Sequence, residues 1–154
     1  MENATSYGCF HVTDTCGRTL GLRSRRDPTV WNWPGGDVER GEDPFTCAAR
    51  EYREELGFGL EVLHPGLVEQ PRLLAVTFTG PGPRWPRVKI GFIFDGGTLA
   101  GDQLNAVTLQ PEEHTEWRTH TVEGWRPLLT EGAHNRLAQV DAALRTATTV
   151  YLPG

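Results

Sequence analysis

The sequence contains little cysteine, and its cysteines form no recognisable pattern. Cys9, Cys16 and Cys47 are the three cysteines among 154 residues, and they show neither a metal-ligand spacing nor the even count of a disulfide framework. The five histidines are scattered without paired spacing, so a zinc site is not expected. We therefore predict a reduced, cytoplasmic protein.

Long hydrophobic runs and an excess of positive charge are also absent. No apolar stretch approaches the length that spans a bilayer, and the chain opens at Met1 without a basic or apolar leader. Lysine and arginine number 15 against 20 aspartates and glutamates, which gives a net charge of −5. We therefore expect neither a membrane nor free polynucleotide as a partner.

Two common catalytic motifs are missing as well. The chain has no G-x-S-x-G elbow of a serine hydrolase and no glycine-rich P-loop ending in Lys-Ser or Lys-Thr. It also lacks internal repeats, low-complexity tracts and long Gly/Ser linkers. A chain of this length buries roughly two thirds of its surface in one core, so we predict a single domain over residues 1–154.

Residues 36–58 carry most of the information about function, and they predict one short helix. Asp43 is suited to cap the helix, Pro44 to begin it and Gly57 to follow its end in a left-handed conformation. At about 100° per residue, the apolar side chains fall on one stripe. These side chains are Phe45, Ala48, Ala49, Tyr52 and Leu56.

Three glutamates, Glu51, Glu54 and Glu55, gather on a second face of this helix. Each like-charge pair costs a few tenths of a kcal/mol, so the cluster needs compensation. One hypothesis is a solvated acidic face that Arg50 and Arg53 neutralise in part. The other is a divalent cation, because Mg²⁺ binds carboxylate oxygens together with substrate phosphates.

The spacing of the glycine, glutamate and arginine residues in this stretch decides between the two hypotheses. Gly36 is followed by five residues and then Glu42, and seven further residues lead to the run REYREELGF, which begins at Arg50. This pattern resembles the Nudix box, G-x5-E-x7-R-E-U-x-E-E-x-G-U with U apolar or aromatic, at every fixed position. The preceding WNWPG, residues 31–35, resembles the family's W-x-x-P-G-G approach to the box. An accidental match is improbable, so we favour the cation.

The resemblance implies an α/β fold, the Nudix fold, in which a mixed β-sheet is sandwiched between helices in a single Nudix hydrolase domain. It implies Mg²⁺-dependent hydrolysis of a nucleoside diphosphate linked to another moiety, with water attacking phosphorus and Mn²⁺ as an alternative metal. The expected partner is a small-molecule nucleotide substrate, and a homodimer is an open alternative to a single chain.

Roles for the box residues follow from the same resemblance. Arg50 is expected to orient a glutamate, and Glu42 to support the loop or an outer metal. Either Glu51 or Glu54 would accept the proton of the attacking water, because the family does not use one position throughout. The oxygen ligands of the metal would be Glu51, Glu54, Glu55 and the carbonyl of Gly35 or Gly36.

One more acidic residue is expected after the box, because members of this family often draw such a ligand from a later loop or strand. Glu112, Glu113 and Glu116 qualify by position. Glu116 directly precedes Trp117, as in MutT-like members, so we expect Glu116 rather than Glu113 or Glu112 to complete the catalytic site. The alternative is that all three are solvated loop charges.

Candidate substrate contacts are cationic or aromatic, since these side chains neutralise phosphates and stack on bases. Arg23 and Arg25 precede the box, and Trp31 occupies the family's recurrent tryptophan position, which is usually structural. Arg84 and Trp85 lie in a loop rich in glycine and proline that should form the tip of a hairpin. We expect substrate binding by Arg23, Arg25, Trp31, Arg84 and Trp85.

Alternating and apolar runs predict strands over residues 7–12, 19–23, 60–63, 73–78 and 88–94. Residues 96–110 have the composition of a loop, and apolar residues at helical spacing predict a closing helix over 132–146.

The sub-family stays open at this point. Residues 71–78 lack the tyrosine that marks dinucleoside polyphosphate hydrolases, and the signature of NADH pyrophosphatases is mostly missing. This leaves a MutT-like nucleoside triphosphate pyrophosphohydrolase or a nucleotide-sugar hydrolase. A Nudix-fold sensor that binds nucleotide without cleavage is a rival, but such domains commonly lose box glutamates. An isopentenyl diphosphate isomerase is another, for which no cysteine is convincingly placed.

Overall fold

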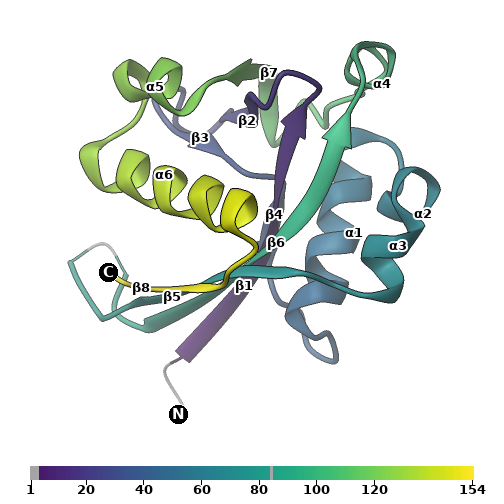
Figure 1. The fold of residues 1–154 in the computed structure, drawn as a ribbon. Coiled ribbons are helices and arrows are strands. Elements are labelled where there is room, and N and C mark those ends of the chain that lie inside the picture. Colours follow the sequence, from purple (N-terminus) through teal and green to yellow (C-terminus); the bar gives the residue numbers. More distant parts are fainter. Residues whose placement is uncertain (1–3, 84) are drawn as a thin grey trace.

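One mixed β-sheet with helices on both faces forms the structure (Figure 1). The computed structural model describes residues 4–83 and 85–154. The strands are β1 (Ala4–Asp14), β2 (Thr19–Ser24), β3 (Trp31–Asn32), β4 (Gly35–Asp37), β5 (Leu73–Thr79), β6 (Val88–Leu99), β7 (His114–His120) and β8 (Val150–Pro153). The helices are α1 (Pro44–Leu56), α2 (Leu60–Leu63), α3 (Pro65–Glu69), α4 (Gly101–Asn105), α5 (Val122–Trp125), the short 3-10 helix η1 (Arg126–Leu128) and α6 (Glu131–Thr146).

The centre of the sheet is the parallel pair of β1 and β6. The strands follow the order β3-β2-β1-β6-β5-β8, with β7 paired to β2 and β4 paired to β1. In the pairing of β4 with β1, Gly35 lies opposite Cys9 and Gly36 opposite Gly8. The glycines at the start of the box are therefore held against the central strand.

Helix α1 has the boundaries that its local sequence predicts. The Asp43 carboxylate accepts a hydrogen bond of 2.9 Å from the backbone N–H of Thr46, and Pro44 stands in the first turn. Gly57 follows the helix with φ of 87°, a left-handed conformation that glycine adopts without steric cost. The prediction of this helix is confirmed.

The apolar stripe of α1 packs on one face of the sheet. Phe10 of β1 meets Phe45 and Tyr52 edge-on, with ring centroids 5.6 and 5.7 Å apart. Tyr52 and Leu56 are fully buried. Helix α6 covers the opposite face, where Val140 packs against residues of β5 and β6 (Figure 1). The acidic face of α1 is thereby turned away from the core.

Most strands and the closing helix agree with the predictions, but two segments do not. Residues 60–63 form helix α2, not a strand, because the Leu60 carbonyl accepts a helical hydrogen bond of 2.7 Å from the N–H of His64. The segment 96–110, predicted as loop, contains the end of β6, since the pairing with β1 continues to Leu99. It also contains α4, whose first turn is held by a hydrogen bond of 2.7 Å from the Ala100 N–H to the side chain of Gln103.

No helix in the described ranges has both the length and the apolar character needed to cross a membrane.

Candidate active site

The glutamates of α1 line a hollow beside the loop that precedes the helix. We call this the carboxylate hollow, and its lining includes Gly35, Glu51, Glu54, Glu55, Gln110 and Glu113. The pairing of β4 with β1 brings the glycine loop to the helix, and glycine is needed there: a Cβ on Gly36 would lie 2.5 Å from Oε1 of Glu51. The glycine loop and the Glu51 carboxylate are therefore in close contact.

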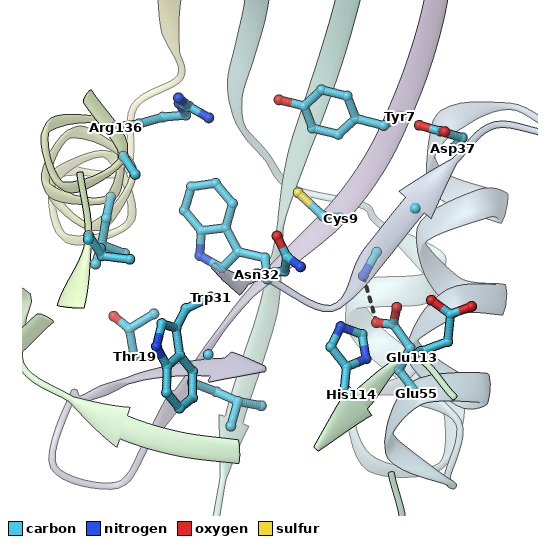
Figure 2. A pocket seen from close by; sticks show the side chains of 18 of the residues that line it. Tyr7, Cys9, Thr19, Trp31, Asn32, Asp37, Glu55, Glu113, His114 and Arg136 are labelled. Carbon is cyan, nitrogen blue, oxygen red and sulfur yellow. Dashed lines mark hydrogen bonds between the residues drawn. The ribbon is translucent and has the colours of Figure 1, made fainter. Parts of the chain in front are cut away.

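Glu55 is the most buried carboxylate of the hollow, with 3% of its surface exposed. Its Oε2 accepts a hydrogen bond of 2.9 Å from the backbone N–H of Gly35 (Figure 2). Burial is the largest influence and, with the charges of Glu51 and Glu113, raises the pKa of Glu55 to about 8 although the Gly35 bond opposes the shift. A bound cation would relieve this unfavourable burial of charge.

Arg50 connects the other glutamates of the box. Its guanidinium donates to both carboxylate oxygens of Glu42, at 2.7 and 3.0 Å, and also to Glu51 at 3.0 Å and Glu54 at 3.3 Å. The bonds to Glu42 are the largest cause that raises the pKa of Arg50, so the guanidinium remains charged. Arg53 pairs with Glu61 of α2, not with the box. One arginine thus holds three carboxylates in position.

The donor set of the hollow fits a hard cation such as Mg²⁺. Most of the side chains that could bind a metal there are carboxylates, and Gly35 and Gly36 of the glycine loop also line the hollow. Within the described part of the chain, no three His, Cys, Asp or Glu side chains are already gathered closely enough to hold an ion. The buried, like-charged setting of Glu55 nevertheless favours a cation.

A larger cavity of about 560 Å³ opens beside the carboxylate hollow (Figure 2). Its walls combine aromatic and polar side chains from β1, β3, β6 and α6. The residues that line it include Tyr7, Trp31, Asn32, Trp33, Lys89, His114, Trp125 and Arg136. Five residues line both spaces, which are therefore continuous: Gly35, Gly36, Asp37, Glu55 and Glu113.

A comparison with protein families shows which family has this arrangement of residues. The family model described as NUDIX domain matches residues 2–142. The chain belongs to the Nudix hydrolase family. The complete Nudix box thus lies on α1 and on the glycine loop before it, where Glu51, Glu54 and Glu55 face the carboxylate hollow.

Similar proteins share this family and fold. The RNA pyrophosphohydrolase of Dinoroseobacter shibae is 31% identical over 121 residues, which cover 68% of this chain and 69% of that protein. The MutT protein from Methanosarcina mazei Go1 is 21% identical, with a TM-score of 0.68 over 94% of this chain and 96% of its own. An Ap4A hydrolase of C. elegans is 20% identical, with a TM-score of 0.65 over 92% of this chain and 98% of its own. At such identities the solved structures show the Nudix fold alone.

Glu116, the acidic residue expected to complete the site, lies in an ion-pair cluster outside the two spaces. Glu116 accepts hydrogen bonds from Arg23 at 2.7 Å and Arg118 at 3.0 Å, and these bonds lower its pKa. Among the described residues that line the two spaces, Glu113 is present and Glu116 is not. The cause is the strand pairing, which sets Glu116 opposite Arg23 on β2. The placement therefore favours Glu113 over Glu116.

Arg23 and Trp31 take part in packing around that ion pair. The guanidinium groups of Arg23 and Arg118 lie over the Trp31 ring, 5.6 and 5.1 Å from its centroid, and the ring of Trp125 lies 5.2 Å from Trp31. Trp31 still lines the larger cavity, whereas Arg23 does not. Arg25 is exposed and donates to the Pro111 carbonyl at 3.2 Å, also away from the cavity.

The tip of the hairpin between β5 and β6 reaches the larger cavity through Trp85. The ammonium of Lys89 lies 5.2 Å from the Trp85 ring centroid and 5.4 Å from that of Tyr7, and it pairs with Asp37 at 3.3 Å. Trp85 is therefore placed where substrate contact was expected. Arg84 lies outside the described residues.

Several lining residues of the Nudix cavity were not among the site residues predicted from the sequence. His114 is 5% exposed, its ring lies beside Glu113 and Glu55 in Figure 2, and burial lowers its pKa. Cys9 also lines the cavity, but burial raises the pKa of its thiol, which stays protonated. Arg136 stands on α6 and lines the cavity, and no local sequence signal marks it as part of a site.

Proposed function

We propose that this Nudix protein catalyses Mg²⁺-dependent hydrolysis of a nucleoside diphosphate linked to another group, with water attacking phosphorus. The observation that carries the proposal is the continuity of the carboxylate hollow with a cavity of about 560 Å³. The hollow offers oxygen ligands for a metal and its phosphates, and the aromatic walls of the cavity suit a nucleoside.

The metal would be held by Glu51, Glu54, Glu55 and Glu113, with a carbonyl of Gly35 or Gly36. When bound, Mg²⁺ supplies charge neutralisation for the phosphoryl oxygens and a lowered pKa for a water molecule, and Mn²⁺ can replace it. Glu113 takes the place first expected for Glu116, because it lines the hollow together with the box glutamates.

The remaining chemistry belongs to side chains that the fold already positions. Arg50 keeps Glu51 and Glu54 aligned through its hydrogen bonds of 3.0 and 3.3 Å. One of these two glutamates accepts the proton of the attacking water. Glu42 supports this arrangement, since it receives two bonds from Arg50 and its backbone lies in the loop before the helix.

Substrate class is supported by family membership and by the relatives. One relative is named an RNA pyrophosphohydrolase and one solved structure an Ap4A hydrolase, and both names refer to phosphoanhydrides of nucleotides. The alternative of a sensor without catalysis is less favoured, because Glu42, Glu51, Glu54 and Glu55 are all present.

A panel of nucleoside triphosphates, nucleotide sugars and dinucleoside polyphosphates tests the proposal. We expect release of phosphate or pyrophosphate from at least one member with Mg²⁺ or Mn²⁺, and none with EDTA. Glu54→Gln should abolish this turnover, whereas Glu123→Gln, an exposed change on α5, should not. Nucleotide binding without turnover of any member would contradict catalysis and favour the sensor.

A further inference from the structure

Arg136 on α6 supplies a cation to the side of the larger cavity that lies away from the carboxylates. Figure 2 shows its guanidinium on the side of the cavity opposite to Glu55, Glu113 and His114. Figure 1 agrees, since α6 and α1 cover opposite faces of the sheet. The cavity is therefore acidic at one end and cationic at the other.

No hydrogen bond or ion pair to Arg136 is found in the part of the chain that the structure describes. Lys89, the other lysine or arginine of the lining, is paired with Asp37 at 3.3 Å. Burial raises the pKa of the Tyr7 hydroxyl and the charge of Arg136 opposes this effect, so the guanidinium lies close enough to influence the cavity wall. Arg136 thus has donors available for a ligand.

The space between the two ends has the character of a nucleoside site. Tyr7 and Trp33 give it aromatic walls, and Asn32 adds an amide that can donate and accept. The 5′ phosphates of a nucleotide would lie at the carboxylate hollow, where a metal neutralises them. A group that reaches Arg136 is then separated from those phosphates by the nucleoside.

We propose, on the basis of the proposed function, that Arg136 binds a second phosphate carried by the ribose of the substrate nucleotide. A guanidinium matches phosphate oxygens with two parallel donors. Arg136 is exposed at the rim of the cavity, where a charged and hydrated group can be accommodated, whereas a base can stack on the half-buried aromatic side chains of Tyr7 and Trp33. The substrate class is a nucleotide phosphorylated both at the 5′ position and at the 2′ or 3′ position.

Binding measurements by isothermal titration calorimetry test this inference without turnover. The ligands are adenosine 5′-monophosphate, adenosine 2′,5′-bisphosphate and adenosine 3′,5′-bisphosphate, each with Mg²⁺. We expect wild type to bind one bisphosphate at least about tenfold more tightly than the monophosphate, and Arg136→Gln to lose that preference. Arg126→Gln, which removes a surface charge paired with Glu123, should keep it.

Binding of a dinucleotide with a 5′-phosphate shows whether the second phosphate can be a phosphodiester or must be a terminal phosphate. If it gains the same preference as the 3′,5′-bisphosphate, the site accepts a phosphodiester of a longer chain; if not, it requires a terminal phosphate, and either result supports the proposal. Equal affinity of wild type for monophosphate and bisphosphates overturns it. So does an Arg136→Gln variant that weakens all ligands equally, because Arg136 would then contact the base or the 5′ phosphate. Loss of hydrolysis with retained preference would count against the proposed catalysis alone.

Discussion

Glu55 is the residue whose surroundings differ most from those of an ordinary glutamate. It is 3% exposed, receives one backbone hydrogen bond from Gly35 and lies near the charges of Glu51 and Glu113. With a pKa of about 8, it is mostly protonated at neutral pH in the metal-free protein. A metal that binds Glu55 must therefore displace a proton, which makes metal affinity depend on pH.

This pKa predicts how the stability of the metal-free protein changes with pH. Because the folded pKa of about 8 lies above the ordinary value of 4.5, the folded state binds more protons than the unfolded state between these values. The contribution of Glu55 is fully present below the lower value, and it is lost as pH rises through the higher one. We expect urea denaturation in EDTA to show a free energy of unfolding that declines more steeply over this range in wild type than in Glu55→Gln.

The matched control is Glu69→Gln, which removes a carboxylate from the exposed surface of α3. Its pH dependence should follow that of wild type. Parallel curves for wild type and Glu55→Gln would show that burial of this carboxyl does not control the titration.

Among the elements of the fold, helix α1 carries both the local sequence signals that define its ends and the glutamates that face the carboxylate hollow. Its cap, its first-turn proline and the glycine after its end are all encoded within a short segment, so no tertiary information is needed to place the helix. Its register then determines which residues are buried with Tyr52 and which face the carboxylate hollow.

Removal of the Asp43 cap tests how much this local signal contributes. The Asp43 carboxylate accepts bonds from the N–H and the hydroxyl of Thr46, at 2.9 and 2.8 Å. We expect Asp43→Ala to lower the free energy of unfolding by about 1 kcal/mol in chemical denaturation, and Asp43→Asn to lower it by less, because asparagine caps helices nearly as well. Equal losses for both would indicate that charge, not capping, is the origin.

Other elements show where local signals fail. Residues 60–63 are four in number and mostly apolar, too few to distinguish a helical period from an alternating one. The extension of β6 to Leu99 depends on its pairing with β1, a contact between distant segments. These elements are specified by tertiary packing, so composition alone predicted them incorrectly.

At the scale of the whole molecule, the topology assembles the site from distant segments. The box predicted the carboxylates of α1 because their spacing is local. The choice between Glu113 and Glu116 depends on how β7 pairs with β2, and the position of Arg136 depends on how α6 packs across the sheet. Neither arrangement has a local signature, which explains why the sequence favoured Glu116 and did not point to Arg136.

The same topology separates two carboxylates that are three residues apart. Glu113 precedes β7 and faces the carboxylate hollow, whereas Glu116 lies within β7 between Arg23 and Arg118. In the proposed function, Glu51, Glu54, Glu55 and Glu113 form a metal-dependent catalytic site. A variant at each of these two positions therefore separates a role in metal binding from a role in packing.

The most direct measurement uses a nucleotide that wild type hydrolyses. Phosphate or pyrophosphate release from it is recorded as a function of Mg²⁺ concentration for wild type, Glu113→Gln and Glu116→Gln. We predict that Glu113→Gln requires a Mg²⁺ concentration about tenfold higher for half-maximal turnover, because one oxygen ligand is lost. Glu116→Gln should show the Mg²⁺ requirement of wild type. A shifted requirement for Glu116→Gln with none for Glu113→Gln, or turnover by wild type that persists in EDTA, would contradict this account.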